Sequence, residues 1–78
     1  MDDWRINFGQ NMRHLRQVHD LTQRQMAQIV GVSVTTYGKM EQCDPKVRIH
    51  IGRVKRICDH FHIDIEEILY QNWPQNMI

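Results

Sequence analysis

The segment Thr22–Glu41, TQRQMAQIVGVSVTTYGKME, decides the fold. Its apolar residues recur at helical spacing, stop at Gly31 and resume after Ser33. Thr22 followed by Gln25 is a capping-box pattern, in which the hydroxyl accepts from an orphan backbone amide and the Gln side chain reaches back. Gly31 suits the left-handed end of a helix, and Ser33 suits the start of the next one. The segment therefore predicts two short helices joined by a tight turn.

Helical spacing continues before this segment. A first helix is expected to start near Trp4, with Asp2 or Asp3 as its cap, and to end near His19–Asp20. The third helix should run to about Gln42. The apolar faces of these first three helices are Trp4, Phe8, Met12 and Leu15, then Met26, Ile29 and Val30, then Tyr37 and Met40.

The start of a fourth helix is ambiguous. The stretch KVRIHI, residues 46–51, alternates like a strand, yet Val47 and the apolar residues after it also fit a helix. We favour a loop from Cys43 to about Val47, then a helix ending near His60–Phe61, with Asp44–Pro45 available as a cap. Its apolar face is predicted at Ile51, Val54, Ile57, Cys58 and Phe61.

A short fifth helix completes the expected fold. Asp64 and Glu67 form another capping pattern before Ile65–Tyr70, and Pro74 closes the helix. The prediction is an all-α, compact bundle of about five short helices over residues 1–70. The tail, residues 71–78, is expected to pack on the core or at a dimer interface, because it is more apolar than a solvated terminus requires.

Length and composition narrow the class of function. A chain of 78 residues buries only about 60% of its unfolded surface, which leaves little room for a deep catalytic cleft and disfavours an enzyme. It has no apolar run long enough to cross a membrane and no basic-then-apolar start, so a cytoplasmic location is expected. Cys43 and Cys58 stand outside any C-x-x-C pattern and are read as reduced thiols.

The charge is polarised along the chain. Residues 4–56 hold ten Lys and Arg against three acids, whereas residues 57–78 hold four acids and no Lys or Arg. A basic portion of this size can attract phosphates, although a solvated basic face is an equally ordinary explanation. By default the charged run Arg24, Arg48, Arg53, Lys55 and Arg56 is taken as solvated.

A helix that begins with short polar side chains after a tight turn can lay its end in a DNA groove. Residues 23–42 resemble the helix-turn-helix of phage repressors and Cro proteins, the Xre-type family, with small Ala27 at the helix crossing and Gly31 in the turn. The flanking stretches FGQNMRHLRQVHDLTQ and ICDHFHIDIEEIL are similar to that family's first and closing helices. Asp20 and Cys43 replace glycines that are usual there, and the loop after Glu41 is about two residues longer.

The resemblance implies a lambda-repressor-like bundle and a set of DNA contacts. Base contacts are expected from Val34, Thr35, Lys39 and Gln23. Phosphate contacts are expected from Thr22, Ser33, Thr36, Gln42, Arg13 and Lys46. It also implies an ion pair between Arg16 and Glu41, which would fix the third helix against the first.

The expected function is that of a transcriptional regulator, most simply a repressor. It would bind a partly palindromic DNA operator as a homodimer, because one helix-turn-helix makes few base contacts. The alternative is an antitoxin or other protein-interaction module on the same scaffold, with a co-encoded protein as partner. No cofactor is expected. Cys58, His60 and His62 lie close in sequence but lack zinc-ligand spacing, so no metal site is expected either.

Overall fold

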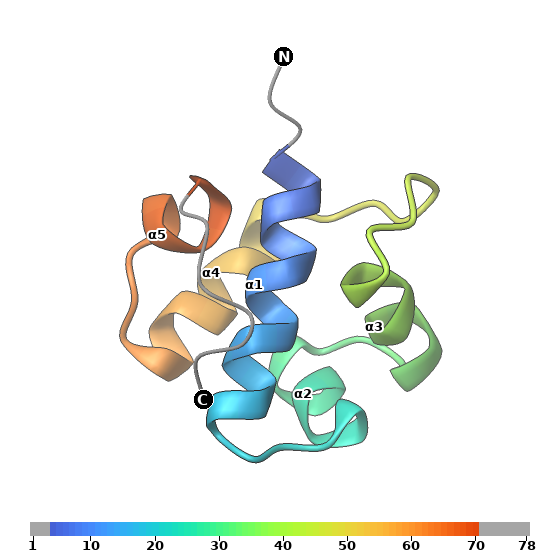
Figure 1. Ribbon diagram of the computed structural model, residues 1–78, viewed down its shortest axis with the longest axis horizontal. Coiled ribbons are helices and arrows are strands. Elements are labelled where there is room, and N and C mark those ends of the chain that lie inside the picture. The colour runs from blue at the N-terminus through green and yellow to red at the C-terminus, as the bar shows by residue number, and fades with distance from the viewer. Residues whose placement is uncertain (1–3, 71–78) are drawn as a thin grey trace.

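The computed structural model describes residues 4–70 of the chain (Figure 1). Its helices are α1 (Trp4–Val18), α2 (Gln23–Val30), α3 (Val34–Glu41), α4 (Ile51–Phe61) and α5 (Ile65–Tyr70). The described residues hold no strand, which confirms the predicted all-α bundle. The predicted cap at Asp2 or Asp3, the stop at Pro74 and the role given to the tail lie outside the described residues.

Helix α1 is the central element of the bundle. It runs through the middle of the molecule, with α2 and α3 on one side and α5 on the other, while α4 passes behind it (Figure 1). The α2–α3 pair therefore rests on both α1 and α4. This arrangement turns the outer face of α3 away from the bundle.

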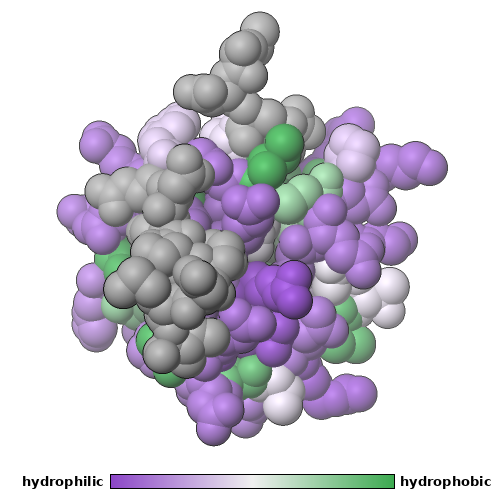
Figure 2. Space-filling view, in the orientation of Figure 1, coloured by the Kyte–Doolittle hydropathy of each residue, from purple (hydrophilic) through white to green (hydrophobic). Residues whose placement is uncertain are grey.

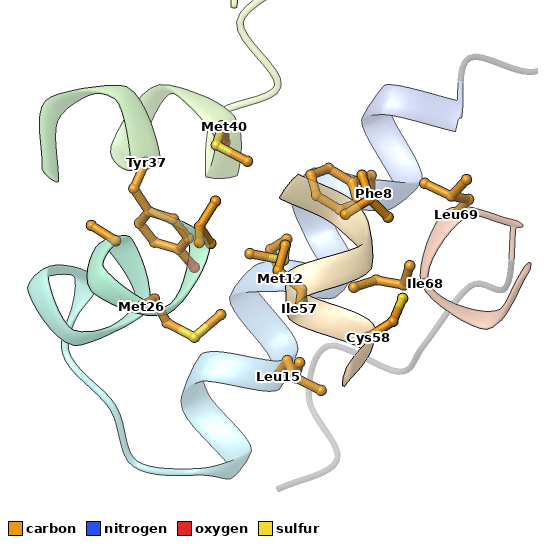
Figure 3. Packing of buried hydrophobic residues seen from close by; sticks show 13 residues of the cluster. Phe8, Met12, Leu15, Met26, Tyr37, Met40, Ile57, Cys58, Ile68 and Leu69 are labelled. Atoms are coloured by element: carbon orange, nitrogen blue, oxygen red, sulfur yellow. The ribbon is translucent and has the colours of Figure 1, made fainter. Parts of the chain in front are cut away.

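The core is formed by apolar side chains from all five helices. Figure 3 shows Tyr37 reaching from α3 toward α2 and Met26, while Met12 and Ile57 fill the space where α1 meets α4. The predicted inner faces are buried at ten positions: Phe8, Met12, Leu15, Met26, Val30, Tyr37, Met40, Val54, Ile57 and Cys58. Met40, at 3% exposure, anchors the end of α3.

The turn between α2 and α3 has the predicted geometry. The Thr22 hydroxyl accepts from the Gln25 amide at 3.1 Å, and the Gln25 side chain accepts from the Thr22 amide at 2.8 Å. Gly31 is left-handed, with φ 86°, and ends α2. Ser33 then caps α3 by accepting from the Thr36 amide at 3.1 Å. Local capping thus fixes where both helices begin, as the sequence predicted.

The predicted start of the fourth helix was too early. Asp44 does not cap it, because its Oδ1 accepts from the Lys46 amide at 2.9 Å within a separate turn. Val47 and Ile49 then face the core in an irregular segment, while Arg48 is exposed. The strand-like alternation reflects this two-residue periodicity, but within the described residues no partner strand pairs with it.

One further prediction about α4 was wrong. Ile51 was expected in the core, yet it is 60% exposed because it is the first residue of the helix and lies beyond the packed region. Arg53 and Arg56 were taken as solvated; Arg56 is exposed and Arg53 is half-buried, and both also reach the end of α2. Arg56 Nε donates to the Ile29 carbonyl at 3.2 Å, and Arg53 Nη1 lies 3.5 Å from the Val30 carbonyl oxygen. Both therefore satisfy carbonyls that a helix C-terminus leaves unpaired.

Candidate nucleic-acid interface

The exposed surface of α3 is the centre of the candidate site. Ser33, Val34 and Thr35 form the start of the helix and are all exposed, as is Lys39 one turn further on. The opposite side of the same helix is closed by Tyr37 and Met40. The first turn therefore presents short side chains to solvent with nothing in the described chain covering them.

Ser33 and Thr36 are linked at the head of α3. Besides accepting from the Thr36 amide, the Ser33 hydroxyl donates to Thr36 Oγ1 at 2.9 Å. The backbone amides of the first turn carry the positive end of the helix dipole, which favours anions nearby. The two hydroxyls lie beside this positive end.

Arg16 and Glu41, which the resemblance pairs, form a two-point ion pair between α1 and α3. Arg16 Nε lies 2.6 Å from Glu41 Oε2, and Arg16 Nη2 donates to Glu41 Oε1 at 3.2 Å. Arg16 Nη1 also donates to the Leu21 carbonyl at 3.3 Å, so the same guanidinium also bonds the loop that leads into α2. The side chain of Glu41 is only 6% exposed. The pair thus joins the last residue of α3 to α1 and to the loop before α2.

The environment of Glu41 favours its charged form. Burial alone would raise the pKa of Glu41, but hydrogen bonds, foremost from Arg16 and also from Gln23, outweigh burial and hold this pKa below its usual value. Burial also raises the pKa of Tyr37 far above its usual range, with the Glu41 carboxylate adding to the effect. Tyr37 is therefore neutral and Glu41 ionised at neutral pH.

Gln23 belongs to the same cluster. Its Nε2 donates to Glu41 Oε1 at 3.2 Å, which bends the side chain across α3. A polar depression of about 290 Å³ lies here, lined by Arg13, Arg16, Gln23, Gly38, Glu41 and Gln42. Three of the residues predicted to contact DNA therefore line one depression: Arg13 of α1, Gln23 of α2 and Gln42 at the end of α3.

Arg13 continues this polar surface along α1. It is exposed and also lines a second depression of about 310 Å³ with Gln10, Gln17 and Glu41. Figure 2 shows hydrophilic side chains gathered over the middle of this face, where α1 and α3 lie in Figure 1. The surface next to α3 is thus rich in side-chain amides and carries the exposed guanidinium of Arg13.

The remaining predicted contacts are more dispersed. Thr22 is exposed, but its hydroxyl is engaged as the cap of α2. Lys46 is exposed in the loop between α3 and α4, in the segment that the resemblance describes least well.

Gly9 allows the close approach of α1 to the end of α3, although the sequence analysis gave it no role. A Cβ at Gly9 would stand 2.5 Å from the Met40 carbonyl oxygen and 2.7 Å from Cys43 Sγ. Only glycine therefore lets α1 approach the end of α3 this closely. A glycine inside an amphipathic helix is the only hint, because it costs helix stability and so suggests a packing reason.

These features define a class of protein. Residues 11–72 match the family model of the Cro/C1-type helix-turn-helix DNA-binding domain, and the chain belongs to that family. The family resemblance expected from the sequence is thus confirmed.

A curated relative refines the comparison. The chain is 33% identical over 71 residues to antitoxin PezA of Streptococcus pneumoniae serotype 4. The match covers 91% of this chain but 44% of the antitoxin, so the chain spans less than half the length of that relative. No solved structure matches at a comparable level of significance.

Two further properties of residues 4–70 concern membrane spans and metal sites. No helix within residues 4–70 has the length and apolarity that a membrane span requires. In the same part of the chain, no group of three or more His, Cys, Asp or Glu side chains is arranged to hold a metal ion.

Proposed function

We propose that this protein binds specific sequences of double-stranded DNA and regulates transcription in the cytoplasm, most simply as a repressor. The observation that carries the proposal is the head of α3, where Val34, Thr35 and Lys39 are exposed while Tyr37 and Met40 anchor the helix from behind. A helix presented in this way fits the major groove, in which each base pair shows a distinct pattern of donors and acceptors.

Each predicted side chain takes a role that its chemistry permits. Val34 would contact a thymine methyl group, and Lys39 would donate to guanine O6 and N7. Thr35 would touch a base edge beside them. Phosphates would be held by Ser33, Thr36, Gln42 and Arg13, and more weakly by Thr22 and Lys46. The depression shared by Arg13, Gln23 and Gln42 supports placing one DNA strand along α1.

The test is selection of bound sequences from random DNA by the purified full chain. We expect an enriched motif, and we expect Thr35→Ala and Lys39→Ala to change the preferred base at separate positions. Lys55→Ala removes an exposed cation from α4 and serves as the control, which should leave the motif unchanged. Recovery of no motif by the wild-type chain would refute the proposal.

We propose further that the protein acts as a homodimer. Two copies related by a two-fold axis would read half-sites about 34 Å apart, and the motif would then be partly palindromic. The tail remains the proposed interface. Removing residues 72–78 should lower the mass measured by sedimentation equilibrium to that of a monomer, whereas an undiminished dimer would exclude the tail from this role.

A second candidate function is that of an antitoxin. The relative named antitoxin PezA favours it, since the match to that protein covers 91% of this chain. An antitoxin would pair tightly with a co-encoded protein. Co-purification of a neighbouring gene product with the chain, together with DNA binding that shows no sequence preference, would favour this function over the first.

A further inference from the structure

The amide of Gln23 is held in one orientation by Glu41. The two residues are joined by the bond from Gln23 Nε2 to Glu41 Oε1. A carboxylate can only accept hydrogen bonds, so the nitrogen of the amide must face it and the carbonyl oxygen must point elsewhere. Because Arg16 also donates two bonds to Glu41, one of them to the same Oε1, the acceptor itself cannot easily move.

Gly38 provides the space in which this side chain lies. A Cβ at Gly38 would stand 4.0 Å from Gln23 Oε1, with no other atom outside the helix nearer. The carbonyl oxygen of Gln23 therefore lies beside the middle of α3, one residue from Lys39. Gln23 itself remains exposed.

We propose, building on the DNA-binding function above, that Gln23 reads an adenine at the outer end of each half-site and that Glu41 is the residue that positions it. An amide nitrogen carries two hydrogens, so the bond to Glu41 leaves one N–H and the carbonyl oxygen available. Adenine offers the complementary pair in the major groove, an acceptor at N7 and a donor at N6.

A phosphate is a poorer partner for this arrangement. Phosphate oxygens only accept, so the carbonyl oxygen of Gln23, which the bond to Glu41 turns away from the carboxylate, would repel them. The neighbouring carboxylate is neutralised by Arg16 and adds no attraction for an anion. Base recognition uses both groups that the bond to Glu41 leaves free, whereas phosphate binding uses one.

The charge on Glu41 is what makes the reading selective. A glutamine without such a neighbour can turn its amide over, and its nitrogen then donates to the acceptors O6 and N7 of guanine. Glu41 prevents this turn because it cannot donate to Gln23 Oε1. A glutamine at position 41 could donate or accept, so it would allow both orientations of Gln23.

The experiment compares motifs selected from random DNA by full-length variants. Gln23→Ala identifies the position read, where the wild-type preference for adenine should be roughly five- to 150-fold, as expected for a bidentate contact. Glu41→Gln should leave adenine and guanine within about twofold of each other at that position and change the others little. Gln28→Ala, the same change on an exposed residue of α2 away from α3, should alter no position.

A second control separates positioning from stability. Arg16→Lys weakens the ion pair but keeps the Glu41 carboxylate, so it should lower stability and retain the adenine preference. An affinity loss in Gln23→Ala that is equal for all sequences would overturn the inference in favour of a phosphate contact. A motif that lacks this position would do the same and leave the proposed function intact, whereas no motif at all refutes both.

The geometry can also be checked without a variant that must fold. In the ¹⁵N-labelled wild-type chain, the side-chain amide signal of Gln23 should shift as Glu41 is titrated with acid. The amide of Gln28, which lies on the face of α2 away from Glu41, should not follow this titration. A Gln23 signal that ignores Glu41 would contradict the inference.

Discussion

At the residue scale, Glu41 connects folding to the candidate site. Its carboxylate accepts hydrogen bonds from Arg16 of α1 and from Gln23 at the start of α2, and Glu41 is the last residue of α3. A pair buried in this way does not necessarily add net stability, but it does specify orientation, because either partner alone would be left as a costly unpaired group. The angle between α3 and α1 thus depends on one carboxylate.

The lowered pKa of Glu41 predicts a pH dependence. A depressed folded-state pKa contributes stability that is present above the unfolded value, about 4.3, and is lost as pH falls toward the folded value. At pH 7, Glu41→Gln should lower the free energy of unfolding by about 1–3 kcal/mol. Urea unfolding from pH 7 to pH 3 should show this difference shrinking below about pH 4.5. A difference that is constant with pH, or absent throughout, would argue against the ion pair.

At the scale of the helix, the bounds of a helix could be predicted where its capping residues are recognisable in the sequence. Thr22, Gly31 and Ser33 carry their signals in their own side chains, so the bounds of α2 and α3 followed from sequence. The start of α4 did not, because Asp44 closes a local turn instead and His50, the residue before the helix, makes no side-chain cap bond. A helix whose start is set by packing leaves no local pattern to find.

Left-handed residues at helix ends give a matched pair of predictions. Asp20 has φ 55° and is exposed, so Asp20→Gly should remove strain and raise the free energy of unfolding by about 0.5–1 kcal/mol. Gly31→Ala should instead lower it by about 1–2 kcal/mol, because φ is 86° and the new Cβ would stand 2.5 Å from Arg53 Nη1. Thermal unfolding of the two variants measures both. Equal effects of the same sign would contradict the geometry.

The contacts that cross the molecule were the least predictable. The approach of α1 to α3 at Gly9, and the reach of Arg53 and Arg56 to the end of α2, join residues far apart in sequence with no spacing rule between them. The Arg16–Glu41 pair was anticipated only because a family resemblance supplied it. The bond from Gln23 to Glu41 was not anticipated, since a glutamine carries no charge pattern that indicates its partner.

At the scale of the whole molecule, the basic and acidic residues are distributed unevenly, and this distribution favours binding of a polyanion on one side. The ten Lys and Arg residues all precede Ile57, and those on the candidate face include Arg13 and Lys39. The acidic residues after Ile57 belong to the end of α4 and to the α5 region, which lies across α1 from α3 (Figure 1). One side of the bundle is thus suited to meet a polyanion.

This arrangement predicts a steep salt dependence. Several phosphate contacts release counterions on binding, so affinity for the selected duplex should fall roughly tenfold or more between 50 and 200 mM salt. Fluorescence anisotropy with a labelled duplex measures the slope, and Arg13→Gln should reduce it by about one unit without changing the preferred sequence. An unchanged slope would remove Arg13 from the set of phosphate contacts.

The central claim is that the first turn of α3 enters the major groove. Its most direct test is an NMR structure of the full chain bound to its selected duplex, read through nuclear Overhauser effects between protein methyl groups and bases. We expect such effects from the Val34 and Thr35 methyl groups to major-groove protons, including a thymine methyl. Contacts that instead involve only the face around Gln28 and His60, with Val34 and Thr35 silent, would contradict it.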